Sequence, residues 1–308
     1  MRSSGDLLAD RRYAYGRSAF DEGDWPAAAD LARQALELAP GFTAAWFLLG
    51  EACERIGEAE ASARAEALAA FSTARRLDPD DALGAGLRLV GLGAGKPEDA
   101  MSTAYVRSLF EEYASRFERH LRQGLAYRGP ELLHDAVRRA CSLLLRPFRF
   151  DLVLDLGCGT GLAAEIFRPE CRRIVGVDLS PAMVRKAEVK RIYDEVEVGD
   201  LVPWLGARPD GKADLVLAAD VFVYVGDLAP IFAAAAAALA PGGLFAFTAQ
   251  AHAGEGVILG ADQRYAHGER HLRSLAQEAA LEPMLLESAP ARRERARDVP
   301  GLVMVLAK

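Results

Sequence analysis

The sequence lacks the patterns of a membrane-spanning, secreted or zinc-binding protein. Its longest apolar run, IFAAAAAALA from Ile231, is well short of the ~20 residues that cross a bilayer. Its first residues contain no apolar stretch of the signal-peptide kind. The 4 cysteines, Cys53, Cys141, Cys158 and Cys171, form no CxxC pair and no metal-ligand spacing. We therefore expect buried thiols in the reducing cytoplasm, no metal site and no membrane contact.

Positive charge is also in short supply. Lys and Arg number 37 and Asp and Glu number 44, which gives a formal net charge of -7. Sequence-independent binding of nucleic acid needs clustered positive charge, so a nucleic-acid partner is not expected. The 308 residues, 51% of them hydrophobic, are enough for two globular domains.

Two similar segments make up the first part of the chain. Small residues recur about 34 residues apart, as at Gly16 and Gly50, which is the period of a tetratricopeptide repeat. The second half of the later segment matches only if five residues are inserted within GEAEASARAEA. In such repeats small residues let paired helices approach closely. Two tetratricopeptide repeats are predicted, and a generic helical bundle is the alternative.

A capping helix and a linker should follow the repeats. DDALGAGLRLVGLG fits the capping helix, with Asp80 or Asp81 as its N-cap. The sequence then becomes rich in Gly and Pro and loses its periodicity. We predict an all-α repeat domain over residues 1–93, a linker over 94–100 and a helical extension over 101–150.

Strands and helices alternate over residues 151–308. This pattern predicts an α/β domain with a doubly wound, Rossmann-like sheet. The seven expected strands are LVLDLG, RIVGVDLS, EVEVGDL, ADLVLAADVFV, GLFAFTAQ, PMLLESA and GLVMVLA. The last two are joined by PARRERARDVP without a helix, so they should form an antiparallel hairpin at a sheet edge. The arginines of this loop are expected to be solvated, and an anion site is the alternative.

A glycine turn follows the first of these strands. In VLDLGCGTG the glycines Gly157, Gly159 and Gly161 alternate strictly. A glycine turn alone also fits nicotinamide, flavin and phosphate sites. The dinucleotide fingerprint, however, is G-x-G-x-x-G. Asp155, just before the turn, would repel a pyrophosphate but suits a ligand with an ammonium and a sulfonium.

Acidic residues recur where the next strands end. Asp178 lies 17 residues after Gly161, where an acid can accept hydrogen bonds from ribose hydroxyls. Asp200 ends the third strand and Asp220 the fourth. Because open α/β sheets bind ligands at the carboxyl ends of their strands, we expect these acids to share one site. The alternative is that each acid caps the helix that follows it.

These motifs resemble the class I S-adenosylmethionine-dependent methyltransferases. VLDLGCGTG, VDLSPAMVRKA and VGDL match the first three motifs, and LVLAADVFVYV and LAPGGLFAFTAQ match the later strands. The resemblance covers roughly Met101 to Lys308. With the repeats, the whole chain resembles bacterial predicted methyltransferases that carry tetratricopeptide repeats. It implies S-adenosylmethionine as cofactor and methyl transfer as activity.

The resemblance also implies cofactor contacts along the strand ends. They fall on Asp155, Gly157, Cys158, Gly159 and Gly161 at the methionine end, Asp178 at the ribose with Leu179 on the adenine, Asp200 at the adenine amine with Leu201 beside it, and Asp220 near the amino-acid portion or the acceptor.

A lid and an acceptor pocket are the remaining expectations. In similar methyltransferases a helix that carries aromatic residues closes over the cofactor, which makes Tyr113, Tyr127 and Arg128 candidates here. Ordinary helix packing is the alternative. His252 and His267 follow the fifth strand and are candidate general bases. The alternative is that both are ordinary histidines of a surface loop. Tyr113 is also a candidate catalytic residue. No Asn-Pro-Pro-Tyr loop and no spaced acids for a metal occur.

The sequence predicts methyl transfer to a small molecule or to a protein presented by the repeats. One rival hypothesis is an adaptor in which the repeats bind a partner and the methyltransferase domain is inactive. Another is a nicotinamide-dependent oxidoreductase, which the glycine spacing and the lack of a Tyr-x-x-x-Lys pair argue against.

Overall fold

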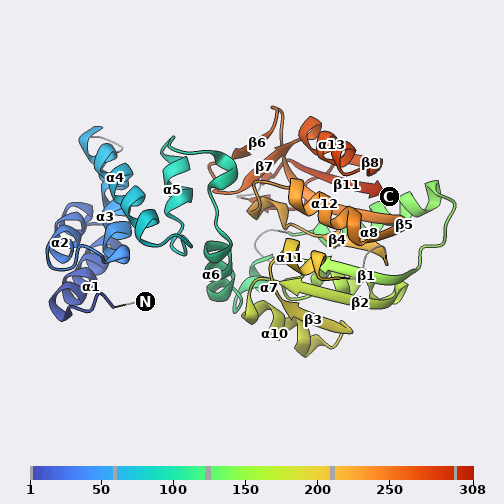
Figure 1. Ribbon diagram of the computed structural model, residues 1–308, viewed down its shortest axis with the longest axis horizontal. Helices are drawn as coiled ribbons and strands as arrows, with labels where there is room; N and C mark the ends of the chain where they lie inside the picture. The colour runs from blue at the N-terminus through green and yellow to red at the C-terminus, as the bar shows by residue number, and fades with distance from the viewer. Residues whose placement is uncertain (1–2, 58–60, 122–125, 209–211, 295–296) are drawn as a thin grey trace. The chain divides into compact units, whose positions relative to one another are not determined.

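The chain folds into two compact units, residues 1–105 and residues 106–308. The computed structural model describes residues 3–57, 61–121, 126–208, 212–294 and 297–308. The first unit is helical and the second is built on a β-sheet (Figure 1). Among the helices described, none is both long and apolar enough to cross a membrane.

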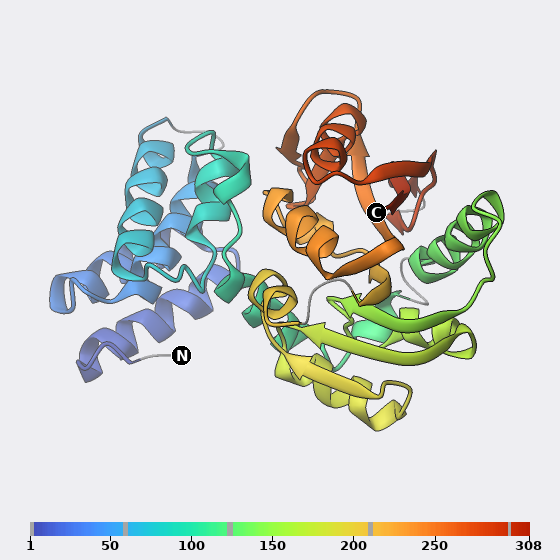
Figure 2. The ribbon, with the colours of Figure 1, turned by 45° about the vertical axis from the view of Figure 1, so that its right-hand side comes forward.

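Consecutive helices of the first unit pack against each other (Figure 2). They are α1 (Leu7–Asp21), α2 (Trp25–Leu38), α3 (Thr43–Ile56), α4 (Ala61–Leu77) and α5 (Ala85–Gly91), followed by the 3-10 turn η1 (Pro97–Asp99). The Asp6 carboxylate caps α1 by accepting from two backbone N–H groups, and Asp24 caps α2. The first unit is therefore an α-helical array of locally capped helices.

The helices approach most closely at glycines. A Cβ atom added to Gly50 would lie 2.6 Å from Cε1 of the buried Phe71 ring. One added to Gly16 would lie 3.2 Å from side-chain atoms of Leu31 and Leu48. The close approach predicted at Gly16 and Gly50 is therefore present, and no larger residue fits at Gly50 without moving Phe71.

The start of α5 differs from the prediction. Its N-cap is Gly84, not Asp80 or Asp81. The Asp81 carboxylate nevertheless accepts from the N–H groups of Ala85 at 2.6 Å and Gly86 at 2.8 Å. The chain makes a further turn before the helix, so Asp81 satisfies the first-turn donors from outside the helix.

The second unit contains the seven strands predicted from the apolar runs. They are β1 (Phe150–Leu156), β2 (Cys171–Asp178), β3 (Glu195–Val198), β4 (Ala213–Ala218), β5 (Leu239–His252), β8 (Glu282–Ser288) and β11 (Gly301–Ala307). Their order is β3-β2-β1-β4-β5-β11-β8. The first five are parallel, and β11 is antiparallel to both β5 and β8. The mostly parallel sheet with an antiparallel edge is therefore confirmed.

Two short hairpins were not predicted. Strands β6 (Val257–Leu259) and β7 (Tyr265–Gly268) pair with each other, and β7 also pairs with the end of β5. These additions make the sheet nine-stranded. Strands β9 (Arg293–Glu294) and β10 (Arg297–Asp298) form a second hairpin inside the arginine-rich loop. The first hairpin exists because β5 runs on to His252, which offers backbone groups beyond the predicted strand.

Helices cover both faces of the sheet, as expected for a doubly wound fold (Figure 2). One core joins the sheet to α11 (Leu201–Gly206), α12 (Ala229–Ala238) and α13 (Glu269–Glu278). The other joins it to α8 (Gly129–Leu143) and α9 (Leu162–Phe167), and α10 (Pro181–Lys190) packs on β2 and β3. Side chains alternate along β1, so Asp155 faces the same side as Val153, toward α8 and α9.

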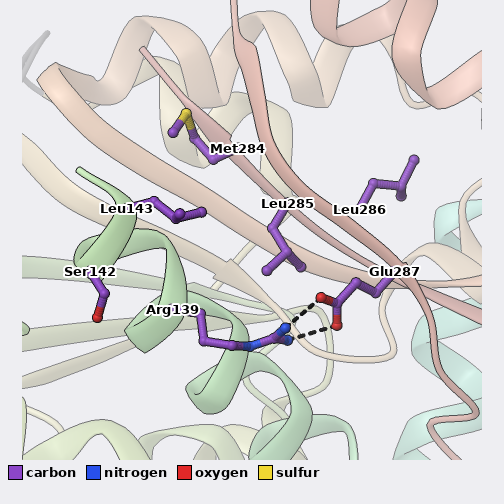
Figure 3. Close-up of a pocket in the computed structure, with 7 residues that line it drawn as sticks. All are labelled: Arg139, Ser142, Leu143, Met284, Leu285, Leu286 and Glu287. Atoms are coloured by element: carbon purple, nitrogen blue, oxygen red, sulfur yellow. Dashed lines mark hydrogen bonds and ion pairs between the residues drawn. The ribbon is translucent and has the colours of Figure 1, made fainter.

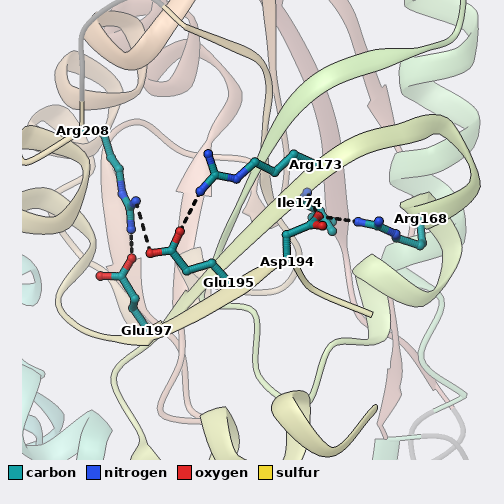
Figure 4. A network of polar contacts seen from close by, with 7 residues as sticks. All are labelled: Arg168, Arg173, Ile174, Asp194, Glu195, Glu197 and Arg208. Atoms are coloured by element: carbon teal, nitrogen blue, oxygen red, sulfur yellow. Dashed lines mark hydrogen bonds and ion pairs between the residues drawn. The ribbon is translucent and has the colours of Figure 1, made fainter. Parts of the chain in front are cut away.

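Ion pairs line the outer part of the sheet around β2 and β3 (Figure 4). The participants are Arg168, Arg173, Asp194, Glu195, Glu197 and Arg208. These side chains are partly exposed, so each pair contributes little to stability, about 0–1 kcal/mol. The Asp194 carboxylate also accepts from the backbone N–H of Ile174 at 2.8 Å. That bond fixes the chain where it returns to the sheet, directly beside Tyr193.

Candidate functional site

The glycine turn lies between the end of β1 and α9. Gly157, Gly159 and Gly161 have φ angles of 59°, 55° and 90°, the left-handed region that favours glycine. A Cβ atom on Gly157 would also lie 2.7 Å from Val221. The three predicted glycines are therefore required by the backbone conformation of the turn.

Asp155 is buried immediately before this turn. Its side chain accepts a hydrogen bond from the Tyr193 hydroxyl at 2.6 Å, and the residue is only 1% exposed. Burial raises the pKa of Asp155 to about 7, although the Tyr193 hydrogen bond acts in the opposite direction. Sequence reasoning missed Tyr193, because nothing near residue 193 signals a partner for an acid 38 residues earlier.

Asp178 links the end of β2 to the glycine turn. Its two carboxylate oxygens accept from the N–H groups of Gly159 and Ser180, each at 2.9 Å. Burial raises the pKa of Asp178 to about 6, and these two hydrogen bonds oppose the shift. The N-cap of α10 is Ser180, so Asp178 is not a helix cap.

Asp200 behaves differently from the other acids. It is the N-cap of α11 and accepts from the N–H of Val202 at 3.2 Å. The capping alternative therefore applies to Asp200. Leu201 is buried in the first turn of α11. Leu179, the other apolar residue of the predicted set, follows Asp178 and is half-buried.

Asp220 forms a buried ion pair that corrects one prediction. Arg292 donates to the Asp220 carboxylate at 2.9 Å, and its side chain is only 2% exposed. The arginine-rich loop was expected to be solvated, and for Arg292 that expectation is wrong. Which arginine of ARRERARD turns inward depends on an acid 72 residues away, so the local sequence carries no signal for it.

Helix α6 (Thr103–Tyr113) contacts the loop between β2 and α10. The Arg107 side chain donates to the carbonyl oxygen of Leu179 at 3.0 Å. The Glu111 carboxylate accepts from the Ser180 hydroxyl and the Ala182 N–H, each at 2.7 Å. These bonds attach the predicted lid helix to the end of β2.

Aromatic rings of the predicted lid and of η4 gather near the glycine turn. The ring centre of Phe110 lies 6.4 Å from Tyr113, 6.1 Å from Phe117 and 5.0 Å from Tyr224. Phe117 begins the short helix α7 (Phe117–Arg119), and Tyr224 ends the 3-10 turn η4 (Phe222–Tyr224) after β4. The Phe117 ring lies 3.5 Å from where a Cβ of Gly159 would be. Tyr113 therefore belongs to an aromatic cluster that reaches the turn.

Tyr127 and Arg128 lie at the start of α8. Burial raises the pKa of Tyr127, and the carboxylates of Asp220 and Asp155 raise it further. The predicted acids Asp220 and Asp155 are therefore near enough for their charges to act on the Tyr127 hydroxyl. Arg128 is exposed, and its backbone N–H donates to the carbonyl oxygen of Ala291 at 2.8 Å.

The two candidate histidines hold the backbone in place. His267 is fully buried in β7, and its Nε2 lies 3.0 Å from the carbonyl oxygen of Phe222. Burial lowers the pKa of His267 to about 4, so the neutral ring donates this bond. In His252, Nε2 contacts the carbonyl oxygen of Gly256 and Nδ1 accepts from the Gly254 N–H, each at 3.1 Å. The surface-loop alternative is wrong for His267.

A groove of about 630 Å³ lies elsewhere, between α8 and the edge strand β8 (Figure 3). Its lining residues are Arg139, Ser142, Leu143, Met284, Leu285, Leu286 and Glu287. The Arg139 guanidinium pairs with the Glu287 carboxylate across the groove. None of the predicted site residues lines it. Within the described ranges, no group of three or more His, Cys, Asp or Glu side chains could hold a metal ion.

A sequence profile of the methyltransferase domain matches residues 110–288, more than half of the chain. The chain belongs to the methyltransferase domain family. The matched region contains the glycine turn, the four strand-end acids and the whole aromatic cluster. The domain is of the class I type that uses S-adenosylmethionine.

Solved methyltransferases share the fold of this domain. One is the 1,6-didemethyltoxoflavin-N1-methyltransferase of Burkholderia thailandensis, solved with its substrate and S-adenosylhomocysteine. It has a TM-score of 0.50 and 20% identity and covers 70% of this chain and 91% of its own. Another is the N-methyltransferase NodS of Bradyrhizobium japonicum, with a TM-score of 0.50, 19% identity and coverage of 66% and 97%.

Curated relatives match over shorter stretches. Human methyltransferase-like protein 27 is 37% identical over 94 residues, which are 30% of this chain and 37% of the relative. The malonyl-[acyl-carrier protein] O-methyltransferase of Serratia marcescens is 31% identical over 124 residues, 40% of this chain and 47% of the relative. The chain thus spans less than half the length of these two relatives.

The residues of the methyltransferase domain fit S-adenosylmethionine. The Asp155 and Asp178 carboxylates flank the glycine turn at the carboxyl ends of neighbouring strands, where a sulfonium nucleoside can be bound. The Thr160 hydroxyl, in the same turn, is buried and has no hydrogen-bond partner within the part of the chain that the structure describes. An unpaired buried hydroxyl is costly unless a ligand satisfies it.

Proposed function

We propose that the protein transfers a methyl group from S-adenosylmethionine to a small-molecule acceptor. The convergence of the positive-φ glycine turn with two buried carboxylates, Asp155 and Asp178, carries this proposal. Both lie at the carboxyl ends of neighbouring parallel strands, β1 and β2, where sheets of this class bind ligands. Membership of the methyltransferase domain family supports it.

The strand order suggests how the cofactor lies. Because the order is β3-β2-β1-β4, the acids follow one another along the sheet edge as Asp200, Asp178, Asp155 and Asp220. In this proposal Asp200 accepts from the adenine amine, Asp178 from the ribose hydroxyls, and Asp155 and Asp220 face the amino-acid portion. Asp178 already accepts two backbone bonds, so ribose hydroxyls would use its remaining lone pairs.

In this proposal the protein positions the cofactor and the acceptor and excludes water from the site. When bound, S-adenosylmethionine supplies a methyl carbon activated by its sulfonium. In this proposal the ring cluster of Phe110, Tyr113, Phe117 and Tyr224 closes over the bound cofactor and excludes water. Burial raises the pKa of Tyr224 to about 12, so its hydroxyl stays protonated and orients an acceptor instead of deprotonating it. Positioning of this kind can supply much of the rate enhancement.

A small acceptor is favoured over a protein by what similar enzymes bind. The Burkholderia enzyme of the same fold was solved with 1,6-didemethyltoxoflavin, although the Serratia relative acts on a protein-bound malonyl group. In this proposal the acceptor enters beside Tyr224 and Tyr113. The side chain of Arg264, 5.9 Å from the Tyr224 ring centre, would then lie near the acceptor.

The helical unit is proposed to be a pair of tetratricopeptide repeats that binds a partner or presents a substrate. Support comes from the glycine spacing between Gly16 and Gly50 and from the close helix packing at both positions. The Glu51 carboxylate in α3 accepts from Arg17 at 2.9 Å and lies 3.2 Å from Arg88 in α5. Ion pairs thus connect one helix of each proposed repeat with the proposed capping helix.

Calorimetric titration of the full chain tests the proposal. S-adenosylmethionine and S-adenosylhomocysteine should bind and NADH should not. Asp178→Ala should abolish binding with the fold retained, whereas the control Asp151→Ala should bind normally, because Asp151 is exposed and pairs with Arg172. Binding of NADH alone would point to an oxidoreductase. No binding by any of the three would favour an adaptor with an inactive domain.

A further inference from the structure

A buried arginine joins three segments on the β4 side of the site. One nitrogen of Arg292 donates to Asp220 at 2.9 Å. Another donates to the side-chain oxygen of Gln250, near the end of β5, and lies 3.7 Å from the Asp262 carboxylate in the β6–β7 turn. Burying a guanidinium carries a large desolvation cost, which is offset only when its hydrogen bonds are satisfied in good geometry.

The backbone of Asp220 is constrained as well. Asp220 has a φ of 59°, an uncommon left-handed conformation for a residue other than glycine. Its N–H donates to the Thr248 hydroxyl at 2.8 Å. Strained residues that surrounding contacts hold in place concentrate at functional sites. The Asp220 side chain is 16% exposed against 2% for Arg292, so the carboxylate is the partner that a ligand can reach.

The sheet register places Asp220 near the glycine turn. Strand β4 is the parallel neighbour of β1, and Leu217 is the register partner of Asp155. Asp220 follows three residues after Leu217. The next residue, Val221, lies 2.7 Å from where a Cβ of Gly157 would be. The Asp220 carboxylate therefore lies on the β4 side of the turn.

We propose that Arg292 is a positioning residue that aims the Asp220 carboxylate at the ammonium of the cofactor's amino-acid portion. This inference rests on the proposed function, because it presupposes that the site takes S-adenosylmethionine. Arg292 holds the Asp220 carboxylate in orientation, and Asp220 then accepts a charge-assisted hydrogen bond from the ammonium. The Arg292 guanidinium contacts residues near the ends of β4 and β5 and in the β6–β7 turn. Loss of Arg292 therefore removes one contact from each of the three segments.

Two related probes test this role. S-adenosylhomocysteine and 5′-methylthioadenosine share the adenosine and a thioether sulfur, but only the former has an amino-acid portion. In calorimetric titrations of the full chain, Arg292→Gln should lower the affinity for S-adenosylhomocysteine about tenfold or more and leave the affinity for methylthioadenosine unchanged. The matched control is Arg293→Gln, whose exposed side chain pairs with Asp298 at 3.1 Å. It should change neither affinity.

The other outcomes overturn the inference in distinguishable ways. If Arg292→Gln lowered the affinity for both probes equally, Arg292 would only maintain the fold. If it lowered neither affinity, Arg292 would have no role in cofactor binding. If Arg292→Gln does not fold, Arg292→Lys keeps the charge without the forked geometry and should still weaken S-adenosylhomocysteine selectively. If the unaltered protein binds neither probe, the proposed function itself fails and the inference fails with it.

Discussion

The Tyr193 hydroxyl donates to Asp155 at 2.6 Å in the interior of the protein. Tyr193 precedes β3 and Asp155 lies in β1, so the bond ties the end of β1 to the segment that leads into β3. Burial disfavours the ionised carboxylate, and the tyrosine bond only partly offsets this effect. An ionised Asp155 that lowers the stability of the folded protein is expected to serve ligand binding. The free energy of unfolding of the ligand-free protein should show this loss of stability.

Asp155→Asn should stabilise the ligand-free protein at pH 8. The pKa of Asp155 is about 7 in the folded protein, above its ordinary value of 3.8. The folded state therefore holds the proton more tightly, and this contribution to stability falls as the pH rises from about 4 to about 7. Urea unfolding should show a gain on the order of 3 kcal/mol at pH 8 that shrinks toward zero near pH 4.

Tyr193→Phe is the companion variant, and it should destabilise the protein at pH 8 by about 1–2 kcal/mol. The loss should be smaller at pH 5, where Asp155 is protonated and the hydrogen bond is no longer charge-assisted. A pH-independent loss in Tyr193→Phe, or an Asp155→Asn protein less stable than the parent at pH 8, would contradict this account of the pair.

Affinity for S-adenosylhomocysteine should fall in acid. The pKa of Asp178 is about 6, so below this pH the carboxyl becomes protonated and accepts the ribose hydroxyls less well. Titrations at constant ionic strength should show a loss of about tenfold or more between pH 7 and pH 5. Asp178→Asn should bind weakly at pH 8 and respond less to pH. An affinity constant over this range would refute the proposed ribose contact.

Glu111→Gln should loosen the lid. Its carboxylate accepts from the Ser180 hydroxyl and the Ala182 N–H, and the Ala182 bond is the main reason that its pKa lies below the ordinary value. An amide accepts these bonds less strongly, so S-adenosylhomocysteine should dissociate a few-fold faster in stopped-flow displacement. Glu112→Gln, an exposed neighbour, is the control. Equal dissociation rates in the two variants would show that this attachment does not govern release.

Gly50→Ala should destabilise the helical unit. The added methyl would lie 2.6–2.8 Å from the Phe71 ring, and overpacking of this kind costs about 1–3 kcal/mol. Gly41→Ala serves as the control, because nothing lies within 4 Å of its added Cβ. Thermal unfolding of the two variants should distinguish the clash with Phe71 from the general effect of replacing glycine by alanine. A Gly50→Ala protein as stable as the control would argue against tight packing there.

Features that depend on residues close together in the sequence could be predicted from it. The apolar runs predicted the seven main strands, and the glycine turn required by positive φ was visible in VLDLGCGTG. Contacts between distant segments were not predictable. The inward turn of Arg292 depends on Asp220, and the burial of His267 depends on the hairpin beside β5. Both are set by tertiary packing, which a pattern of nearby residues does not encode.

The position of β11 has a consequence for the order of folding. It lies between β5 and β8, although β8 precedes it in the chain. Strand β8 therefore joins the sheet through β11, whose pairing with β5 links residues 51 (Gly301 and Gln250) to 63 (Ala307 and Leu244) positions apart. Pairings of this range form slowly. The loop that carries Arg292 connects these two strands, so the β4 side of the site is complete only after the C-terminal strand has joined the sheet.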